Sequence, residues 1–202
     1  ALAQYKQIND ELAKKLAAAG IDLNELNKRL GSLQLGPLDS DTDSALAALA
    51  AQYPDLIKYD AAHGMLRFAS DLTFDSGQDR VKEGAGASLT ALAKILSSGA
   101  ASAYEVMVVG HTDAQPISAN TAKNHPTNLH LSCHRAISVR NALAAQGVPK
   151  NKMFASGWGE ERPLVPNGPR GNTQQNRRVE IFLTRPTGTP VPVNAPSQHL
   201  KA

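Results

Sequence analysis

Residues 105–136 read EVMVVGHTDAQPISANTAKNHPTNLHLSCHRA, and this part of the sequence is the most informative about the fold. It opens with a short apolar run, EVMVV, which is bounded by turn residues and is typical of a central strand that ends at Gly110. A long polar loop follows, and then apolar residues recur at helical spacing from Ser132, the expected N-cap, to Gly147. The stretch therefore predicts a strand, a polar loop and an amphipathic helix in succession.

Similar patterns continue on both sides of this stretch. The runs LIKYD and MLRFAS read as the two strands of a hairpin that turns at residues 60–64, and residues 85–96 place apolar side chains at helical spacing. Downstream, MFASG is a short strand, and RVEIFLT alternates as a half-buried strand does. Strands and helices in this order predict an α/β (α+β) sandwich, a mixed β-sheet with helices covering one face.

The composition excludes several classes of protein. The 202 residues are 42% hydrophobic, which is enough for one main core. The net charge of +3 comes without a dense basic stripe, so no nucleic-acid partner is expected. No apolar run approaches the roughly 18 to 20 residues of a membrane-spanning helix, so the chain as given is expected to be soluble. Cys133, the single cysteine, cannot form an internal disulfide or a multi-cysteine metal site.

The chain divides by composition into three parts. Residues 1–52 are expected to be a helical stalk or linker, with helical stretches interrupted at Gly20 and by the turn-rich run GPLDSDTD. The narrow apolar stripe of this part suits either a helix packed on its own domain or a short coiled coil. Residues 53–185 form the main domain, and residues 186–202 are a Pro-rich tail that we expect to be disordered.

The polar loop and the helix after it hold four of the six histidines, which raises the question of a metal site. The candidate ligands are His111, Asp113, His130 and His134, the last two at the spacing of zinc-binding helices. If Ser132 caps the helix, however, His130 precedes the first turn and does not share a helical face with His134. The sequence therefore predicts no metal.

Covalent catalysis would have to use Cys133, with His134 or His111 as its base. Adjacent residues on a helix point about 100° apart, so Cys133 and His134 are poorly placed for it. Nothing in the sequence marks an oxyanion hole. We therefore expect no catalytic residues.

Asp113 and Arg135 form the most informative pair of charges. Asp113 follows a strand end and Arg135 is expected in the first turn of the next helix, so both lie near the same edge of the sheet. An arginine can hold a carboxylate in two parallel hydrogen bonds while an aspartate accepts from an ammonium group, so the pair suits a zwitterionic ligand. An internal salt bridge that ties the loop to the helix explains the same pattern, and the charges alone do not separate the two interpretations.

Five motifs resemble those of one known family. They are FDSG (74–77), GHTD (110–113), TNLHLSCHRA (127–136), GWGEERP (157–163) and NRRVEI (176–181). In this order and spacing they resemble the OmpA-like peptidoglycan-binding domain, over roughly residues 55–185. The run DAQP, at residues 113–116, resembles the version in MotB-type flagellar stator anchors.

The resemblance implies a binding site. In the family, the aspartate of the GHTD motif holds the ammonium group of the diaminopimelate in a peptidoglycan stem peptide, and the arginine of the LSxxRA motif holds its carboxylate. These positions are Asp113 and Arg135 here. As further pocket or supporting residues the resemblance implies Asp75, Thr112, Asn128, Leu131 and Arg178. Plainer roles fit three of these: Asp75 as a helix cap or loop brace, Arg178 as the partner of an acidic neighbour, and Asn128 as a brace of its own loop.

The function implied by the resemblance is non-covalent peptidoglycan binding that anchors an envelope protein to the cell wall, without catalysis, cofactor or metal. The expected location is the periplasm of a Gram-negative-type bacterium, with an anchor to the inner or outer membrane upstream of this chain. One alternative is a MotB-type stator anchor, a homodimer whose binding is gated through the N-terminal helices. The second alternative, a cell-wall hydrolase, is disfavoured because the sequence marks neither paired carboxylates in a cleft nor a metal cluster.

Overall fold

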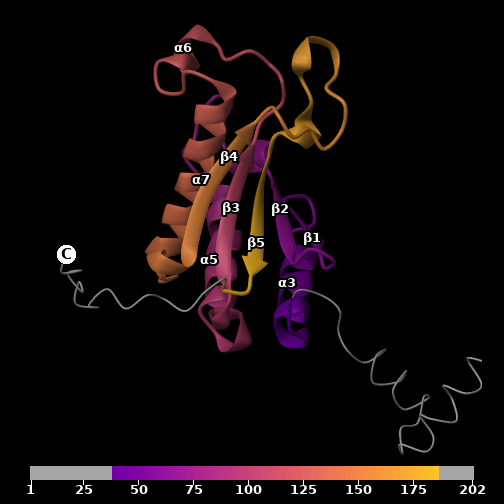
Figure 1. The fold of residues 1–202 in the computed structure, drawn as a ribbon, viewed down its shortest axis with the longest axis vertical. Coiled ribbons are helices and arrows are strands. Elements are labelled where there is room, and N and C mark those ends of the chain that lie inside the picture. The colour runs from indigo at the N-terminus through magenta and orange to yellow at the C-terminus, as the bar shows by residue number, and fades with distance from the viewer. Residues whose placement is uncertain (1–37, 187–202) are drawn as a thin grey trace, which may run out of the picture. The chain divides into compact units, whose positions relative to one another are not determined.

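The computed structural model describes residues 38–186, which form one mixed sheet with helices packed against it (Figure 1). The five strands lie in the order β1-β2-β5-β3-β4, and β3 and β4 are the one parallel pair among these neighbours. Their bounds are β1 (Ile57–Asp60), β2 (Met65–Ala69), β3 (Glu105–His111), β4 (Met153–Gly159) and β5 (Arg178–Thr184). The predicted mixed sheet is confirmed.

The last strand of the chain lies in the middle of the sheet. β5 pairs in antiparallel fashion with β2 on one side and with β3 on the other. Its first residue, Arg178, is opposite Ala69, the last residue of β2, and opposite His111, the last residue of β3. The ends of β2 and β3 and the start of β5 therefore meet at one edge of the sheet, where residues far apart in sequence become neighbours.

Three long helices cover one face of the sheet, as predicted (Figure 1). Apolar residues of α3, α5 and α7 share a core with inward-facing strand residues such as Leu66, Val108 and Ile181. The helices are α3 (Ser40–Gln52), α4 (Ser70–Thr73), α5 (Glu83–Leu96), α6 (Ala119–Ala122) and α7 (Asn128–Ala145). Short 3-10 helices are η1 (Gly99–Ala103), η2 (Lys150–Lys152), η3 (Pro169–Gly171) and η4 (Gln174–Asn176).

The start of α7 differs from the prediction. The helix begins at Asn128, and its N-cap is Thr127, whose hydroxyl accepts a hydrogen bond from the backbone N–H of His130. Ser132, the predicted N-cap, is fully buried inside the helix. A serine one turn further on gives the same local signal as the true cap, because both residue types cap helices well. Arg135 consequently lies in the second turn rather than in the first.

The structure places α3 in the main domain, which differs from the predicted boundary between residues 52 and 53. Leu46 and Leu49 of α3, together with Leu38 before it, belong to the same buried core as the sheet. Asp39 caps α3 by accepting from the backbone N–H groups of Asp41 and Thr42. The remainder of the predicted stalk, and the predicted tail after Pro186, lie outside residues 38–186. Within these residues, no helix is long and apolar enough to cross a membrane.

The sheet face away from the helices carries a buried charge cluster. Glu180 accepts from Arg178 at 2.8 Å, lies 3.5 Å from Arg67 on the neighbouring strand, and lies 3.3 Å from the imidazole of His111. Burial alone would raise the pKa of Glu180, but its contacts with His111 and Arg178 lower this pKa to about 2. Glu180 thus stays ionised and holds the central strands together by charge.

Replacing Glu180 should make stability less dependent on acid pH. Because the pKa of Glu180 is lowered on folding, the carboxylate stabilises the folded state fully above its ordinary pKa of 4.5 and progressively less as the pH falls toward 2. We expect Glu180→Gln to lose about 2 kcal/mol at pH 7. Urea unfolding at pH 7 and pH 3 should show a smaller difference from the wild type at the lower pH. An unchanged difference would contradict this role.

Removing a buried side chain of α3 tests whether this helix is part of the domain. Leu46 has no exposed surface, so Leu46→Ala should lower the free energy of unfolding by about 3 kcal/mol. Leu164→Ala is the matched control, because Leu164 is 44% exposed and its truncation should cost well under about 1 kcal/mol. Urea denaturation of the two variants measures both values. Equal losses would mean that α3 does not share the core.

Candidate ligand-binding site

A pocket of about 440 Å³ opens at the edge where β2 and β3 end and β5 begins. Segments that follow β2, follow β3, precede β5 and open α7 each contribute to its walls. Figure 1 shows α6 and the segment between β4 and β5 projecting from this same end of the sheet. The charged side chains that line the pocket are Asp71, Lys82, Asp113, Arg135 and Arg177.

Arg177 occupies the position between the two carboxylates of the pocket. Its Nε and Nη2 atoms donate to the two oxygens of Asp71 at 2.8 and 2.6 Å, and its Nη1 atom donates to Asp113 Oδ2 at 2.5 Å. The strand register explains this meeting, since Asp71 lies just after β2, Asp113 just after β3 and Arg177 just before β5. These hydrogen bonds, first those with Asp71 and then the one with Asp113, raise the pKa of Arg177.

Asp113 is buried and largely satisfied by the protein. Besides Arg177, its Oδ2 atom accepts from the backbone N–H of Thr173 at 3.0 Å, and Oδ1 accepts from the N–H of Gln115 at 3.3 Å. A carboxylate can accept about four hydrogen bonds, so Oδ1 keeps room for one more donor. The guanidinium partner of Asp113 is Arg177, so the internal Asp113–Arg135 salt bridge considered from sequence is not formed.

Arg135 is a buried cation without a carboxylate partner within residues 38–186. Only 4% of it is exposed, and the guanidinium packs 5.1 Å from the ring centre of Phe74. Its Nε donates to the carbonyl of Gln78 at 2.9 Å, and its Nη2 donates to the carbonyl of Asp75 at 3.3 Å. Burial lowers the pKa of Arg135 to about 10, so the side chain still carries its charge at neutral pH.

Two glycines let α7 approach the sheet and thereby place Arg135. A Cβ atom on Gly110 of β3 would lie 2.0 Å from the backbone oxygen of Ser132, and one on Gly157 of β4 would lie 2.3 Å from the Ser132 hydroxyl. That hydroxyl also accepts from the backbone N–H of Gly159 at 2.9 Å. The close contact between α7 and the two parallel strands fixes the position of Arg135 in the wall of the pocket.

Five of the seven predicted site residues line the pocket. They are Asp113, Arg135, Thr112, Asn128 and Leu131. Asn128 also braces the rim, since its amide donates to the carbonyl of Gln115 and to the carboxylate of Glu160.

The structure places the side chains of Asp75 and Arg178 elsewhere. The Asp75 side chain is 75% exposed and pairs with Lys82 at 3.2 Å, so this residue reaches the site through its backbone carbonyl. Arg178 lies on the opposite face of the sheet, where it pairs with Glu180. These contacts agree with the plainer roles considered from sequence. Asp75 braces its loop by pairing with Lys82, and Arg178 pairs with its acidic neighbour Glu180.

Sequence reasoning missed Arg177 and Asp71. Alternation along the last strand contained a signal for Arg177, because side chains two apart share a face and Val179 is a core residue. The first arginine of NRRVEI therefore lies on the side of the helices, whereas the second lies opposite. Asp71 carries no such signal, since its role depends on β5 lying beside β2.

The histidine set considered from sequence is not brought together. His111 lies on the far side of the sheet, 3.3 Å from Glu180, and the ring of His130 hydrogen-bonds to Thr127 at 2.8 Å. Because α7 starts at Asn128, His130 and His134 lie one turn apart on the same helix. The expectation that His130 precedes the helix was therefore wrong. Their separate partners keep them from forming one site.

The pocket therefore combines a buried guanidinium, which has no carboxylate partner in the described part of the chain, with a carboxylate that can accept one more hydrogen bond. A guanidinium binds carboxylates through parallel hydrogen bonds, and a carboxylate accepts well from ammonium groups. Such an arrangement is suited to a ligand that carries both charges. The two groups come from α7 and from the loop after β3, so they sit on separate walls of the pocket.

Comparison with known proteins identifies the family. The model of the OmpA family matches residues 73–177, more than half of the 202 residues, and the chain belongs to this family. The matched range runs from the last residue of α4 to Arg177 and includes every residue that lines the pocket except Asp71. The resemblance seen in the motifs is thereby confirmed.

Curated relatives share the domain but are longer. "Probable lipoprotein YiaD" of Escherichia coli (strain K12) is 34% identical over 120 residues, which are 59% of this chain and 51% of the relative. "Motility protein B" of Helicobacter pylori (strain J99) is 29% identical over 121 residues, or 59% of this chain and 46% of the relative. The chain thus spans about half the length of these relatives.

Solved structures share the fold. The cell wall anchor of the T6SS from Pseudomonas aeruginosa has a TM-score of 0.60 at 25% identity, covering 70% of this chain and 97% of that one. The periplasmic domain of Helicobacter pylori MotB has a TM-score of 0.55 at 26% identity, covering 64% and 80%. The predicted fold class is confirmed by these matches.

Substituting the glycine beneath α7 should separate the helix from the sheet. Gly110→Ala forces a Cβ against the backbone of Ser132, which cannot give way as a flexible side chain would, so we expect a loss of about 3 kcal/mol or more in unfolding free energy. Gly86→Ala in α5 is the control: nothing lies within 4 Å of the added Cβ, and stability should rise by about 0.5–1 kcal/mol. Thermal and urea unfolding measure both, and a neutral Gly110→Ala would refute the close contact.

Proposed function

We propose that this chain is a peptidoglycan-binding module that holds the diaminopimelate of a stem peptide without covalent chemistry. The observation that carries the proposal is Arg135, a buried cation with no carboxylate partner among the described residues. Leaving a charge buried without a counter-charge costs free energy, so the pocket gains when a ligand supplies a carboxylate. The OmpA family membership and the GHTD and LSxxRA motifs give this carboxylate a source.

In the proposed complex the two charges of the ligand reach different walls of the pocket. The carboxylate of diaminopimelate binds the guanidinium of Arg135, and the ammonium group donates to Asp113 at its less occupied oxygen, Oδ1. Arg177 holds Asp113 in place rather than binding the ligand carboxylate first, because both of its edges already serve Asp71 and Asp113. Thr112, Asn128 and Leu131 complete the walls.

The proposed role is to anchor an envelope protein to the cell wall in the periplasm of a Gram-negative-type bacterium, without enzymatic activity. Two findings support this role: a structural neighbour is described as a cell wall anchor, and one curated relative is named as a lipoprotein. The matched part of the chain covers about half the length of each of these relatives. An anchor to the inner or outer membrane is therefore part of the proposal.

A MotB-type stator anchor is the second candidate. It is favoured by the likeness to Motility protein B and by the run DAQP at 113–116, of which Asp113, Gln115 and Pro116 line the pocket. In this version the N-terminal helices join two copies and binding depends on that dimer. Fusing two copies through the N-terminal segment separates the candidates: a stator-type anchor binds stem peptide in the fused form and fails to bind as a monomer.

Replacing Arg135 should remove binding. We expect Arg135→Ala to weaken the affinity for a diaminopimelate stem peptide roughly 100-fold, because the carboxylate loses its charged partner. Arg135→Lys should recover part of it, since the charge remains but the bidentate geometry does not. Calorimetry measures each affinity. Asp113→Asn should weaken binding to a similar degree through the ammonium group.

The controls separate binding from folding. Arg140→Ala removes an arginine from the same helix that donates to the carbonyls of Met153 and Lys150, outside the pocket, and it should leave the affinity unchanged. A stem peptide with lysine in place of diaminopimelate lacks the side-chain carboxylate and should therefore bind the wild type weakly. Unchanged affinity in a folded Arg135→Ala variant would sink the proposal, and muropeptides cleaved by the wild type would favour a hydrolase instead.

A further inference from the structure

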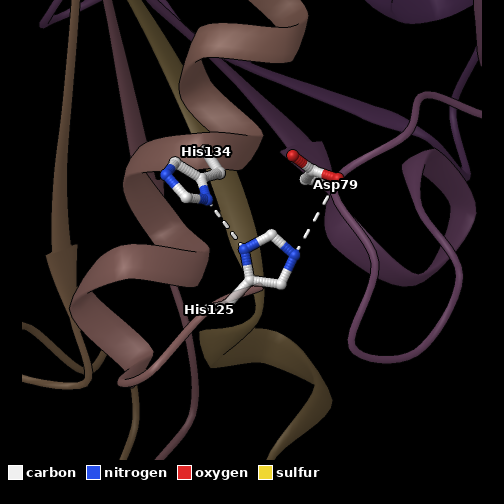
Figure 2. Close-up of side chains that lie close together, drawn as sticks. All are labelled: Asp79, His125 and His134. Atoms are coloured by element: carbon white, nitrogen blue, oxygen red, sulfur yellow. Dashed lines mark hydrogen bonds and ion pairs between the residues drawn. The ribbon is translucent and has the colours of Figure 1, made fainter. Parts of the chain in front are cut away.

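Two histidines and an aspartate meet beside the pocket, outside the residues that line it (Figure 2). The Nδ1 atoms of His125 and His134 are 2.8 Å apart, and His125 Nε2 lies 3.9 Å from Asp79 Oδ1. One possible ligand atom from each of the three residues lies within 4.8 Å of the others. The side chains point toward one another from separate parts of the chain, as Figure 2 shows.

Each member belongs to a segment that also forms the pocket. Asp79 follows Gln78, whose carbonyl accepts from Arg135 Nε. His125 lies at the end of the segment that leaves β3 and passes over the rim of the pocket. His134 directly precedes Arg135 on α7. A ligand held by all three side chains would therefore connect three segments that form the walls of the pocket.

The residue types of the cluster are those that bind transition-metal ions. The short contact between two ring nitrogens requires one ring to donate and the other to accept, so at least one imidazole is neutral at that atom. His125 is buried, and its ring lies between His134 and Asp79. Asp79 supplies a carboxylate, and its side chain is 39% exposed, which leaves it free to adjust.

We propose that His125, His134 and Asp79 form a site for a divalent transition-metal ion of the zinc type. Two imidazoles and a carboxylate are a common zinc ligand set, and a water molecule would take the fourth position. With metal–ligand bonds of about 2.0–2.2 Å, tetrahedral ligand atoms lie roughly 3.3 Å apart. The two Nδ1 atoms already approach this spacing. Asp79 faces the other nitrogen of His125, Nε2, so its partly exposed carboxylate would have to shift toward the Nδ1 atoms to complete the set.

Nitrogen ligands exclude calcium and magnesium as the natural occupants, because these ions prefer oxygen ligands. His130, one turn before His134, is exposed and hydrogen-bonded to Thr127, so it is not a ligand. The bound ion would tie the segment after β3 to α7 and to the loop between α4 and α5. We therefore expect the ion to stabilise the rim of the pocket whatever ligand the pocket accepts.

The test is a titration of the whole chain, produced without a histidine tag, with Zn²⁺ alone in competition with a chromophoric chelator. The wild type should bind one ion. His125→Gln, His134→Gln and Asp79→Asn should each weaken this binding, the histidine variants by at least about 10-fold. His130→Gln is the matched control on the same helix and should bind as the wild type does. A Cys133→Ser variant should also bind as the wild type does, because the adjacent thiol is not a ligand in the proposal.

A second readout does not depend on the chelator. Zn²⁺ in excess should raise the melting temperature of the wild type and of His130→Gln but not that of His134→Gln, since an ion that binds the folded state stabilises it by mass action. The proposal is overturned by the absence of saturable Zn²⁺ binding, by binding that survives both histidine variants, or by binding that is lost in Cys133→Ser. Because Asp79 is partly exposed, Asp79→Asn keeps the test valid if a variant at buried His125 does not fold.

Discussion

The hydrogen bonds of Arg177 to Asp71 and Asp113 hold the candidate site together. They exist because β5 lies between β2 and β3, which brings the residue before β5 next to the residues that follow its two neighbours. The Asp71 end of this bridge is partly exposed, so it adds little to stability. Its effect is on position: one guanidinium joins the segment before β5 to the segments after β2 and β3, and it holds the Asp113 carboxylate in the wall of the pocket.

This arrangement also explains why Arg135 keeps no carboxylate partner within residues 38–186. Arg177 engages Asp113, while Gly110 and Gly157 allow α7 to lie close enough to the sheet that Arg135 is buried. The packing on Phe74 and two carbonyl acceptors make the burial tolerable without neutralising the charge. A pocket built in this way holds a positive charge in place before any ligand arrives, which is the basis of the proposed recognition of a carboxylate.

The two faces of the sheet divide the charged residues into separate roles. Glu180, Arg178 and His111 lie on the face away from the helices and stabilise the central strands, whereas Arg177 and Asp113 serve the pocket. The proposed metal ligands form a third group on the other side of the pocket wall, where His134 and Arg135 are neighbours on α7 but have different partners. Adjacent residues thus take part in different functions because a helix or strand turns them to different surroundings.

The fold class, the order of strands and helices, and the placement of Asp113 and Arg135 near one edge of the sheet could all be predicted from the sequence. These depend on local periodicity and on motifs, both of which can be read along the chain. It misplaced the start of α7, since Thr127 and Ser132 are equally good caps, and it selected Arg178 where alternation from Val179 favours Arg177. The tertiary structure was needed to show that Arg177 rather than Arg135 pairs with Asp113, that α3 belongs to the core, and that Asp79 lies beside His125 and His134. Each of these contacts joins segments far apart in sequence, and strand order and helix packing, rather than any local pattern, bring such segments together.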